Sequence, residues 1–228
     1  MDNRKLISVR DSGTEFISKG KVTHVFGPPK SGKSTLSASI AFELAKHDLH
    51  VSIISTERPI EIRMQSMIEA EGGYIRELME TISTSDIFTF DDLIHTLTHE
   101  LPTIELASDL LIIDSLTSSY RSHANPVSLT LLRKALSTLQ SLAIRGNIAV
   151  MYTNQVASTM TANNDFRPVA SASTRSYSDI TLRLTRKSNE STEITFEDLS
   201  GEELEVLVPF TISAKGIDEF EQLFQVLE

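Results

Sequence analysis

A glycine-rich stretch near the N-terminus carries the clearest chemistry in this chain. It fits the phosphate-binding pattern G-x-x-x-x-G-K-[ST] and reads Gly27-Pro28-Pro29-Lys30-Ser31-Gly32-Lys33-Ser34, followed by Thr35. Backbone N–H groups of such a loop point at phosphate oxygens, and its glycines allow close approach. We expect Lys33 to contact the β- and γ-phosphates and Ser34 to hold Mg²⁺. Lys30 suits either a phosphate contact or an exposed position. The alternative to a phosphate-binding loop is that the whole stretch is an ordinary strand-to-helix turn that binds nothing.

A second candidate for the magnesium site follows a run of four aliphatic residues. Leu110-Leu111-Ile112-Ile113 has the character of a buried strand, and Asp114 ends it. At the end of such a strand, a carboxylate can orient Mg²⁺ directly or through water. Capping of the next turn is the alternative role for Asp114.

Two further polar residues follow apolar runs. Glu57 comes after the run at 51–54, where a carboxylate can activate the water that attacks the γ-phosphate. From the residues alone, that role and a cap on the following helix are equally good interpretations, and Glu61 is a second candidate base. Gln155 comes after the run at 148–152. Its amide could bond the γ-phosphate and pass the presence of nucleotide to the next loop, or it could cap the strand.

The hydrophobic pattern predicts a fold that brings these strand ends together. Apolar runs at 22–26, 51–54, 87–90, 110–113 and 148–152 alternate with helical patterns at 34–46, 60–70, 91–100 and 129–145. This alternation predicts an α/β fold with a doubly wound, mostly parallel sheet, whose ligands lie at the carboxyl ends of the strands. Further apolar runs at 180–184, 193–197, 205–208 and 210–213 predict antiparallel β-hairpins at the C-terminal edge.

Length and composition bound the class of protein. The 228 residues suit one domain over 1–228, with a short N-terminal extension at 1–20 and a flexible loop at 157–176. The chain has no cysteine, which excludes a disulfide scaffold, and no long apolar run, so we expect a cytoplasmic protein without signal peptide or membrane span. With 21 basic and 31 acidic residues the net charge is −10, which predicts weak, salt-sensitive affinity for any DNA.

Together these motifs resemble those of the RecA/RadA recombinase superfamily, and the chain is most similar to its short archaeal RadB-type paralogs. The resemblance spans 22–217, and four elements carry it in family order: 27–35, Thr56-Glu57, Ile112-Ile113-Asp114-Ser115 with Tyr120-Arg121, and Thr153-Asn154-Gln155-Val156. The last is the most discriminating, because most other P-loop classes lack it. The resemblance implies a RecA-like P-loop NTPase core with ATP and Mg²⁺ as cofactors.

The resemblance also implies roles for single residues. Glu57 is then the catalytic carboxylate, Lys33 contacts the phosphates, and Gln155 couples ATP to a DNA-facing loop. Arg63 would stack on adenine, although its spacing from Glu57 is shortened. That DNA-facing loop holds Arg167 and Arg175, which would contact single-stranded DNA or be plain surface residues.

The expected function is a slow, Mg-dependent ATPase that acts as an accessory or regulatory factor in DNA repair and homologous recombination. Its partners would be ATP, weakly bound single-stranded DNA, and a protein partner or a second copy of the chain, with no membrane. We expect no helix-hairpin-helix domain before the core, and the loop is sparsely basic, so a strand-exchange filament is not expected. The alternative is a KaiC-like or motility-accessory module, in which nucleotide gates an interaction with little hydrolysis and no DNA binding; nothing argues specifically for a helicase loader.

Overall fold

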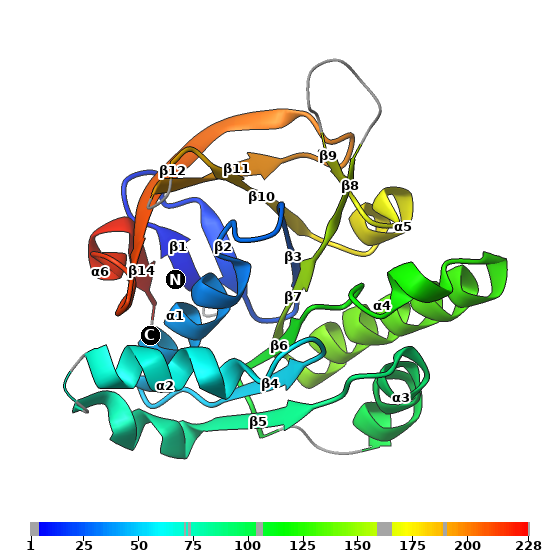
Figure 1. The fold of residues 1–228 in the computed structure, drawn as a ribbon, viewed down its shortest axis with the longest axis horizontal. Helices are drawn as coiled ribbons and strands as arrows, with labels where there is room; N and C mark the ends of the chain where they lie inside the picture. Colours follow the sequence, from blue (N-terminus) through cyan, green and yellow to red (C-terminus); the bar gives the residue numbers. More distant parts are fainter. Residues whose placement is uncertain are drawn as a thin grey trace.

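A nine-stranded sheet forms the centre of the molecule, in a computed structural model that describes residues 5–70, 72, 74–103, 107–158, 166–188 and 191–227 (Figure 1). Its order is β13-β12-β11-β10-β3-β7-β6-β4-β5. The strands are β3 (Val22–Phe26), β4 (Val51–Ser55), β5 (Ile82–Asp86), β6 (Leu110–Asp114), β7 (Ala149–Asn154), β10 (Ile180–Arg186), β11 (Ser191–Glu197), β12 (Glu203–Ser213) and β13 (Gly216–Ile217). The stretch from β10 to β5 is parallel, whereas β10 to β13 pair antiparallel. The predicted fold class is therefore confirmed.

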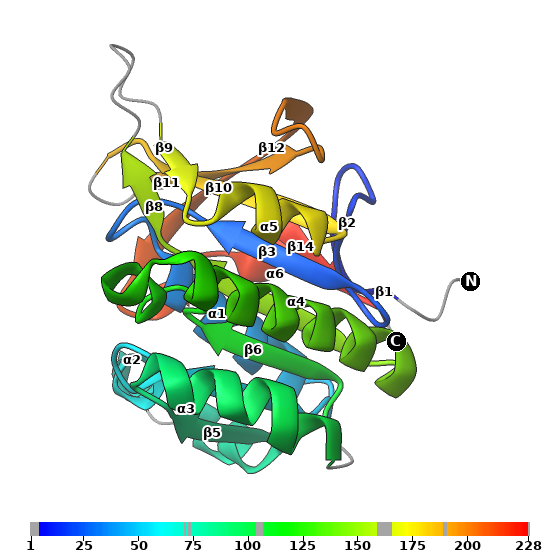
Figure 2. The same cartoon turned by 90° about the vertical axis from the view of Figure 1, so that its right-hand side faces the viewer.

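Helices cover both faces of this sheet (Figures 1 and 2). They are α1 (Lys33–Ala45), α2 (Ile60–Ala70), α3 (Phe90–His95), α4 (Pro126–Gly146), α5 (Ser171–Ser176) and α6 (Phe220–Leu223). Successive strand residues point to opposite faces, so Ile112 packs in the hydrophobic cluster with α1 and α2, while Ile113 packs in the cluster with α3 and α4. This double covering explains why β6, inside the sheet, is apolar and buried from Leu110 to Ile113. No helix among the described residues is long and apolar enough to cross a membrane.

The ends of α4 follow from local side-chain chemistry. The Asn125 side chain accepts a hydrogen bond from the Ser128 N–H, and Pro126 occupies the first helical position. At the other end Asn147 adopts the left-handed conformation that terminates many helices. The helix therefore begins three residues earlier than the leucine pattern at 129–145 predicted.

The strand predicted at 87–90 is wrong. The strand is β5, at Ile82–Asp86, and Phe90 already begins α3, whose first turn is capped by the Thr89 hydroxyl. Because β5 lies at the edge of the sheet, only its Ile82 is buried, and the rest of the strand is polar. A half-buried edge strand has no continuous apolar run to reveal it.

Two further small sheets were not predicted from the sequence. Strand β1 (Lys5–Val9) pairs antiparallel with β2 (Glu15–Ser18) and with β14 (Phe224–Val226), which brings the two ends of the chain together. Within the segment 157–176, for which the sequence predicts a flexible loop, β8 (Val156–Ser158) pairs with β9 (Phe166–Pro168), and α5 follows. Residues 159–165 of that loop lie outside the described part of the chain.

Candidate nucleotide-binding site

The glycine-rich loop connects β3, in the middle of the sheet, to the start of α1. Gly32 has φ of 94°, a conformation that residues with side chains rarely adopt. A Cβ at Gly27 would lie 2.6 Å from the Leu184 carbonyl oxygen and 2.6 Å from the Ser31 hydroxyl, so the loop is too tightly folded for a larger residue there. Both glycines are thus required by the backbone path itself.

The first turn of α1 is open to an anion. Helices α3 and α4 have side-chain caps from Thr89 and Asn125, whereas α1 has no side-chain cap and no acidic residue in its first turn. The first N–H groups of a helix have no partner within the helix and carry partial positive charge. A phosphate group would fit this helix start both in hydrogen bonding and in charge.

Lys33 is held within the loop by backbone carbonyl groups. Its ammonium donates to the carbonyl oxygens of Gly27 at 2.8 Å and Pro28 at 3.0 Å. Burial lowers the pKa of Lys33 from its ordinary value, and the charges of Asp114 and Glu57 counter that shift. The ammonium group is therefore poised beside two carboxylates, at the place where a phosphate would supply further negative charge.

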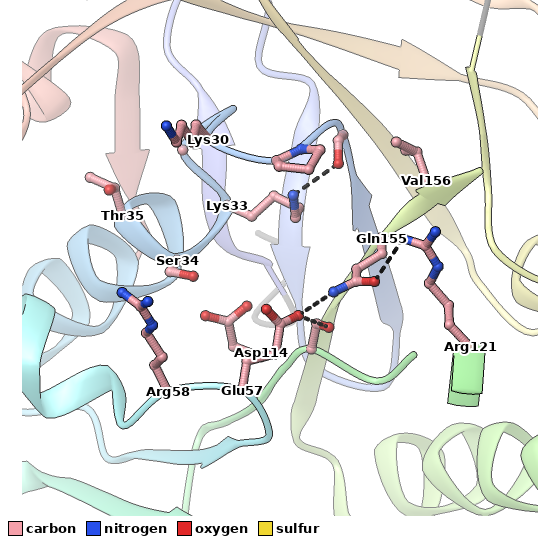
Figure 3. Close-up of a pocket in the computed structure, with 14 residues that line it drawn as sticks. Lys30, Lys33, Ser34, Thr35, Glu57, Arg58, Asp114, Arg121, Gln155 and Val156 are labelled. Carbon is pink, nitrogen blue, oxygen red and sulfur yellow. Dashed lines mark hydrogen bonds between the residues drawn. The ribbon is translucent and has the colours of Figure 1, made fainter. Parts of the chain in front are cut away.

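A cavity of about 390 Å³ opens above this loop (Figure 3). Ten of the residues predicted for the site line it: Gly27, Pro29, Lys30, Gly32, Lys33, Ser34, Thr35, Glu57, Asp114 and Gln155. Pro28 and Ser31 belong to the same loop but do not line the cavity, and Ser31 is buried beneath it. Four lining residues were not predicted to contact nucleotide: Arg58, Ser115, Arg121 and Val156.

Ser34 and Asp114 provide oxygen atoms of the kind that Mg²⁺ prefers. Burial raises the pKa of Asp114 above its ordinary value, although hydrogen bonds from Ser34 and Thr153 and the charge of Lys33 act in the opposite direction. Thr153, on the neighbouring strand β7, donates its hydroxyl to Asp114 Oδ1 and thereby fixes the carboxylate. The hydroxyl and carboxylate pair therefore fits a magnesium ion in chemical type.

Glu57 lies at the end of β4 and is joined to the end of β7 through Gln155. The Gln155 amide nitrogen donates to Glu57 Oε1 at 2.6 Å, and Arg121 donates to the Gln155 amide oxygen at 3.3 Å (Figure 3). The Ser115 hydroxyl donates to the same Glu57 oxygen at 3.1 Å. Two donors thus orient a carboxylate that is itself exposed at the cavity.

Asn154, next to Gln155, is anchored in the core. Its amide nitrogen donates to the Val169 carbonyl at 3.0 Å and to the His24 Nε2 at 3.2 Å, and its amide oxygen accepts a hydrogen bond from Thr117. Asn154 is fully buried. It ties the end of β7 to the segment that precedes α5.

Arg63 does not reach the cavity that the other predicted residues share. It lies on α2, donates to the Ser213 carbonyl oxygen at 2.8 Å, and is not among the lining residues. Burial lowers its pKa from the ordinary value. The shortened spacing from Glu57 is the sequence feature that indicated this difference.

Arg175 is not a plain surface residue, because its side chain is largely buried and forms an ion pair. Its guanidinium forms an ion pair with Glu197, whose carboxylate is fully buried and also pairs with Arg183 Nε at 2.8 Å. The Arg175 side chain also donates to the Ser171 hydroxyl at 3.0 Å. By contrast, Arg167 on β9 is exposed, so its contact with DNA stays a prediction.

A family model described as Rad51 matches residues 6–220. The chain belongs to the Rad51 family. Within that family, the protein named "DNA repair and recombination protein RadB" of Methanocaldococcus jannaschii is 28% identical over 207 residues, covering 88% of this chain and 93% of that protein. The protein of the same name from Thermococcus sibiricus is 30% identical over 142 residues, covering 61% of each, so this alignment spans less than two thirds of that relative.

A solved structure, "Crystal structure of the RadB recombinase", superposes with a TM-score of 0.70 at 24% identity, covering 89% of this chain and 92% of that one. This superposition shows that the Rad51-family chain has the RecA-like fold. Its similarity in sequence to the RadB proteins makes it of RadB type. The comparisons do not support the alternative of a KaiC-like or motility-accessory module.

Proposed function

We propose that this chain binds MgATP in the cavity above the Gly27–Lys33 loop and hydrolyses it slowly. The convergence of Lys33, Glu57 and Asp114 on one cavity carries the proposal. With Lys33, three further cations line the cavity, Lys30, Arg58 and Arg121, against the carboxylates of Glu57 and Asp114. Four cations and two anions make the cavity locally positive in a chain of net charge −10, which suits a polyphosphate.

In this proposal each residue has one task. The loop N–H groups and Lys33 hold the phosphates, and Ser34 with Asp114 holds the metal. Mg²⁺ at that position would neutralise charge that develops on the transferred phosphoryl group. Glu57 accepts a proton from the attacking water, while Ser115 and Gln155 keep its carboxylate oriented.

We further propose that the ATPase serves DNA repair and homologous recombination as an accessory factor. The names of the RadB relatives support this role. The exposed Arg167, on the hairpin that follows Gln155, is the candidate contact for single-stranded DNA. A cytoplasmic location, weak DNA affinity and a protein partner or a second copy of the chain belong to the same proposal.

Equilibrium binding of ATP in the presence of Mg²⁺ tests the nucleotide site. Lys33→Ala is expected to weaken ATP binding at least tenfold, because the loop loses its buried ammonium group. Lys134→Ala is the matched control, since Lys134 is exposed on α4 away from the cavity. Equal ATP affinity in the wild type and Lys33→Ala would reject the assignment.

A further inference from the structure

Arg58 contributes to the positive charge of the nucleotide cavity, but the proposed function gives it no contact of its own. It directly follows Glu57 in the loop between β4 and α2, is exposed, and lines the cavity. Within the described part of the chain it forms no hydrogen bond or ion pair. An arginine head group without a partner, beside a P-loop, is available for a ligand.

The direction of the Arg58 side chain indicates which part of a ligand it could contact. In Figure 3 the Arg58 side chain rises from its loop toward Ser34 at the start of α1, whereas Gln155 and Arg121 approach from the opposite side. Arg58 therefore lies on the side of the cavity where the first turn of α1 presents its uncapped N–H groups. A phosphate bound by those groups would be within the field of the guanidinium.

The other arginine near this edge is already engaged. Arg63 donates to the Ser213 carbonyl oxygen at 2.8 Å and does not line the cavity. A guanidinium that bonds a carbonyl group has fewer donors left for a ligand. Arg58 is thus the arginine that α2 and its preceding loop offer to the nucleotide.

We propose that Arg58 contacts the phosphate chain of the bound nucleotide. This contact raises the affinity of the protein for nucleotides that carry several phosphates. Guanidinium groups bind phosphate oxygens through paired, charge-assisted hydrogen bonds, which are stronger than neutral ones. The inference rests on the proposed function, because it needs ATP in this cavity. It adds a phosphate ligand outside the Gly27–Lys33 loop, in the residue next to the candidate base.

The test is competitive binding of ATP and adenosine to the full chain, for the wild type and for Arg58→Gln. We expect Arg58→Gln to weaken ATP binding about tenfold and to leave adenosine binding unchanged, because only ATP carries phosphates. Added salt should shrink the difference between the two proteins. Arg145→Gln, at the exposed last turn of α4, is the matched control and should bind ATP as the wild type does.

The outcomes separate this inference from the proposed function. If Lys33→Ala loses ATP binding while Arg58→Gln stays within twofold of the wild type, the role of Arg58 is wrong and the site assignment stands. If Arg58→Gln weakens ATP and adenosine equally, a phosphate contact is excluded. If the wild-type chain binds no ATP, both proposals fail.

Discussion

The Gln155 amide nitrogen lies 2.6 Å from Glu57 Oε1 and donates a hydrogen bond to it. This bond joins the ends of β7 and β4, which are separated in the sheet by β6. A phosphate entering the cavity would compete for the same amide donor, because Gln155 and Lys33 line the same cavity. The Gln155 amide would therefore have two alternative acceptors, the carboxylate of Glu57 and a phosphate oxygen.

Replacing Gln155 should separate nucleotide binding from the response to DNA. Gln155→Ala is expected to bind ATP within about twofold of the wild type, since Lys33 and the loop remain, while the ratio of hydrolysis rates with and without single-stranded DNA falls to near one. Gln65→Ala, on the exposed face of α2, serves as control. Undiminished stimulation in Gln155→Ala would show that the coupling runs elsewhere.

Replacing Asp114 should change the magnesium requirement. In Asp114→Asn the amide oxygen can still accept from Thr153, but the charge that would attract the metal is lost. We expect the Mg²⁺ concentration for half-maximal ATP binding to rise about tenfold. Because burial raises the pKa of Asp114, the charged form is disfavoured in the folded state, so Asn should not lower the free energy of unfolding. An unchanged magnesium titration would count against Asp114 as a metal ligand.

The two arginines of the 157–176 segment should behave differently. Arg175→Ala is expected to lower the free energy of unfolding by about 2 kcal/mol, because buried Glu197 loses one of its two partners. Arg167→Ala should leave stability within about 0.5 kcal/mol of the wild type and weaken binding to single-stranded DNA. Urea unfolding and DNA titration at low salt measure both effects. Equal stability of the two variants would contradict the buried ion pair.

Buried His24 should make folding sensitive to acid. Burial lowers its pKa to about 3, and the charge of Arg175 adds to the shift. Because the folded pKa lies below the unfolded value of 6.5, the unfolded chain binds a proton on His24 that the folded chain does not. The free energy of unfolding is therefore unaffected by His24 above pH 6.5, and it falls by about 1.4 kcal/mol per pH unit as the pH drops from 6.5 toward 3. His24→Phe, which keeps a ring between Phe26 and Tyr152, should flatten that part of the pH dependence of urea unfolding. If the free energy of unfolding depends on pH in the same way in both proteins, His24 is not the source of the acid sensitivity.

Much of the site could be predicted because it follows from local patterns and one rule of sheet topology. The loop at 27–34, the aliphatic run before Asp114 and the polar residues after β4 and β7 are all visible in the sequence. Parallel strands end at the same edge of a sheet, so these residues were expected to meet, and they line one cavity.

The features that could not be predicted depend on long-range pairing. Strand β1 pairs with β14 at the other end of the chain, and no local pattern encodes such a partner. Arg175 has no sequence feature that singles out Glu197 as its partner. Similarly, Arg58 and Arg63 lie five positions apart, and only the three-dimensional structure shows which of them lines the cavity.

Steady-state ATP hydrolysis by the wild type and Glu57→Gln, with and without single-stranded DNA at low salt, decides whether Glu57 is the catalytic base. We expect Glu57→Gln to keep ATP binding but to lose at least about 100-fold in rate, because the proton acceptor is gone. Glu61→Gln, on α2, should hydrolyse ATP as the wild type does. A fully active Glu57→Gln would contradict the account and move the base to Glu61 or elsewhere.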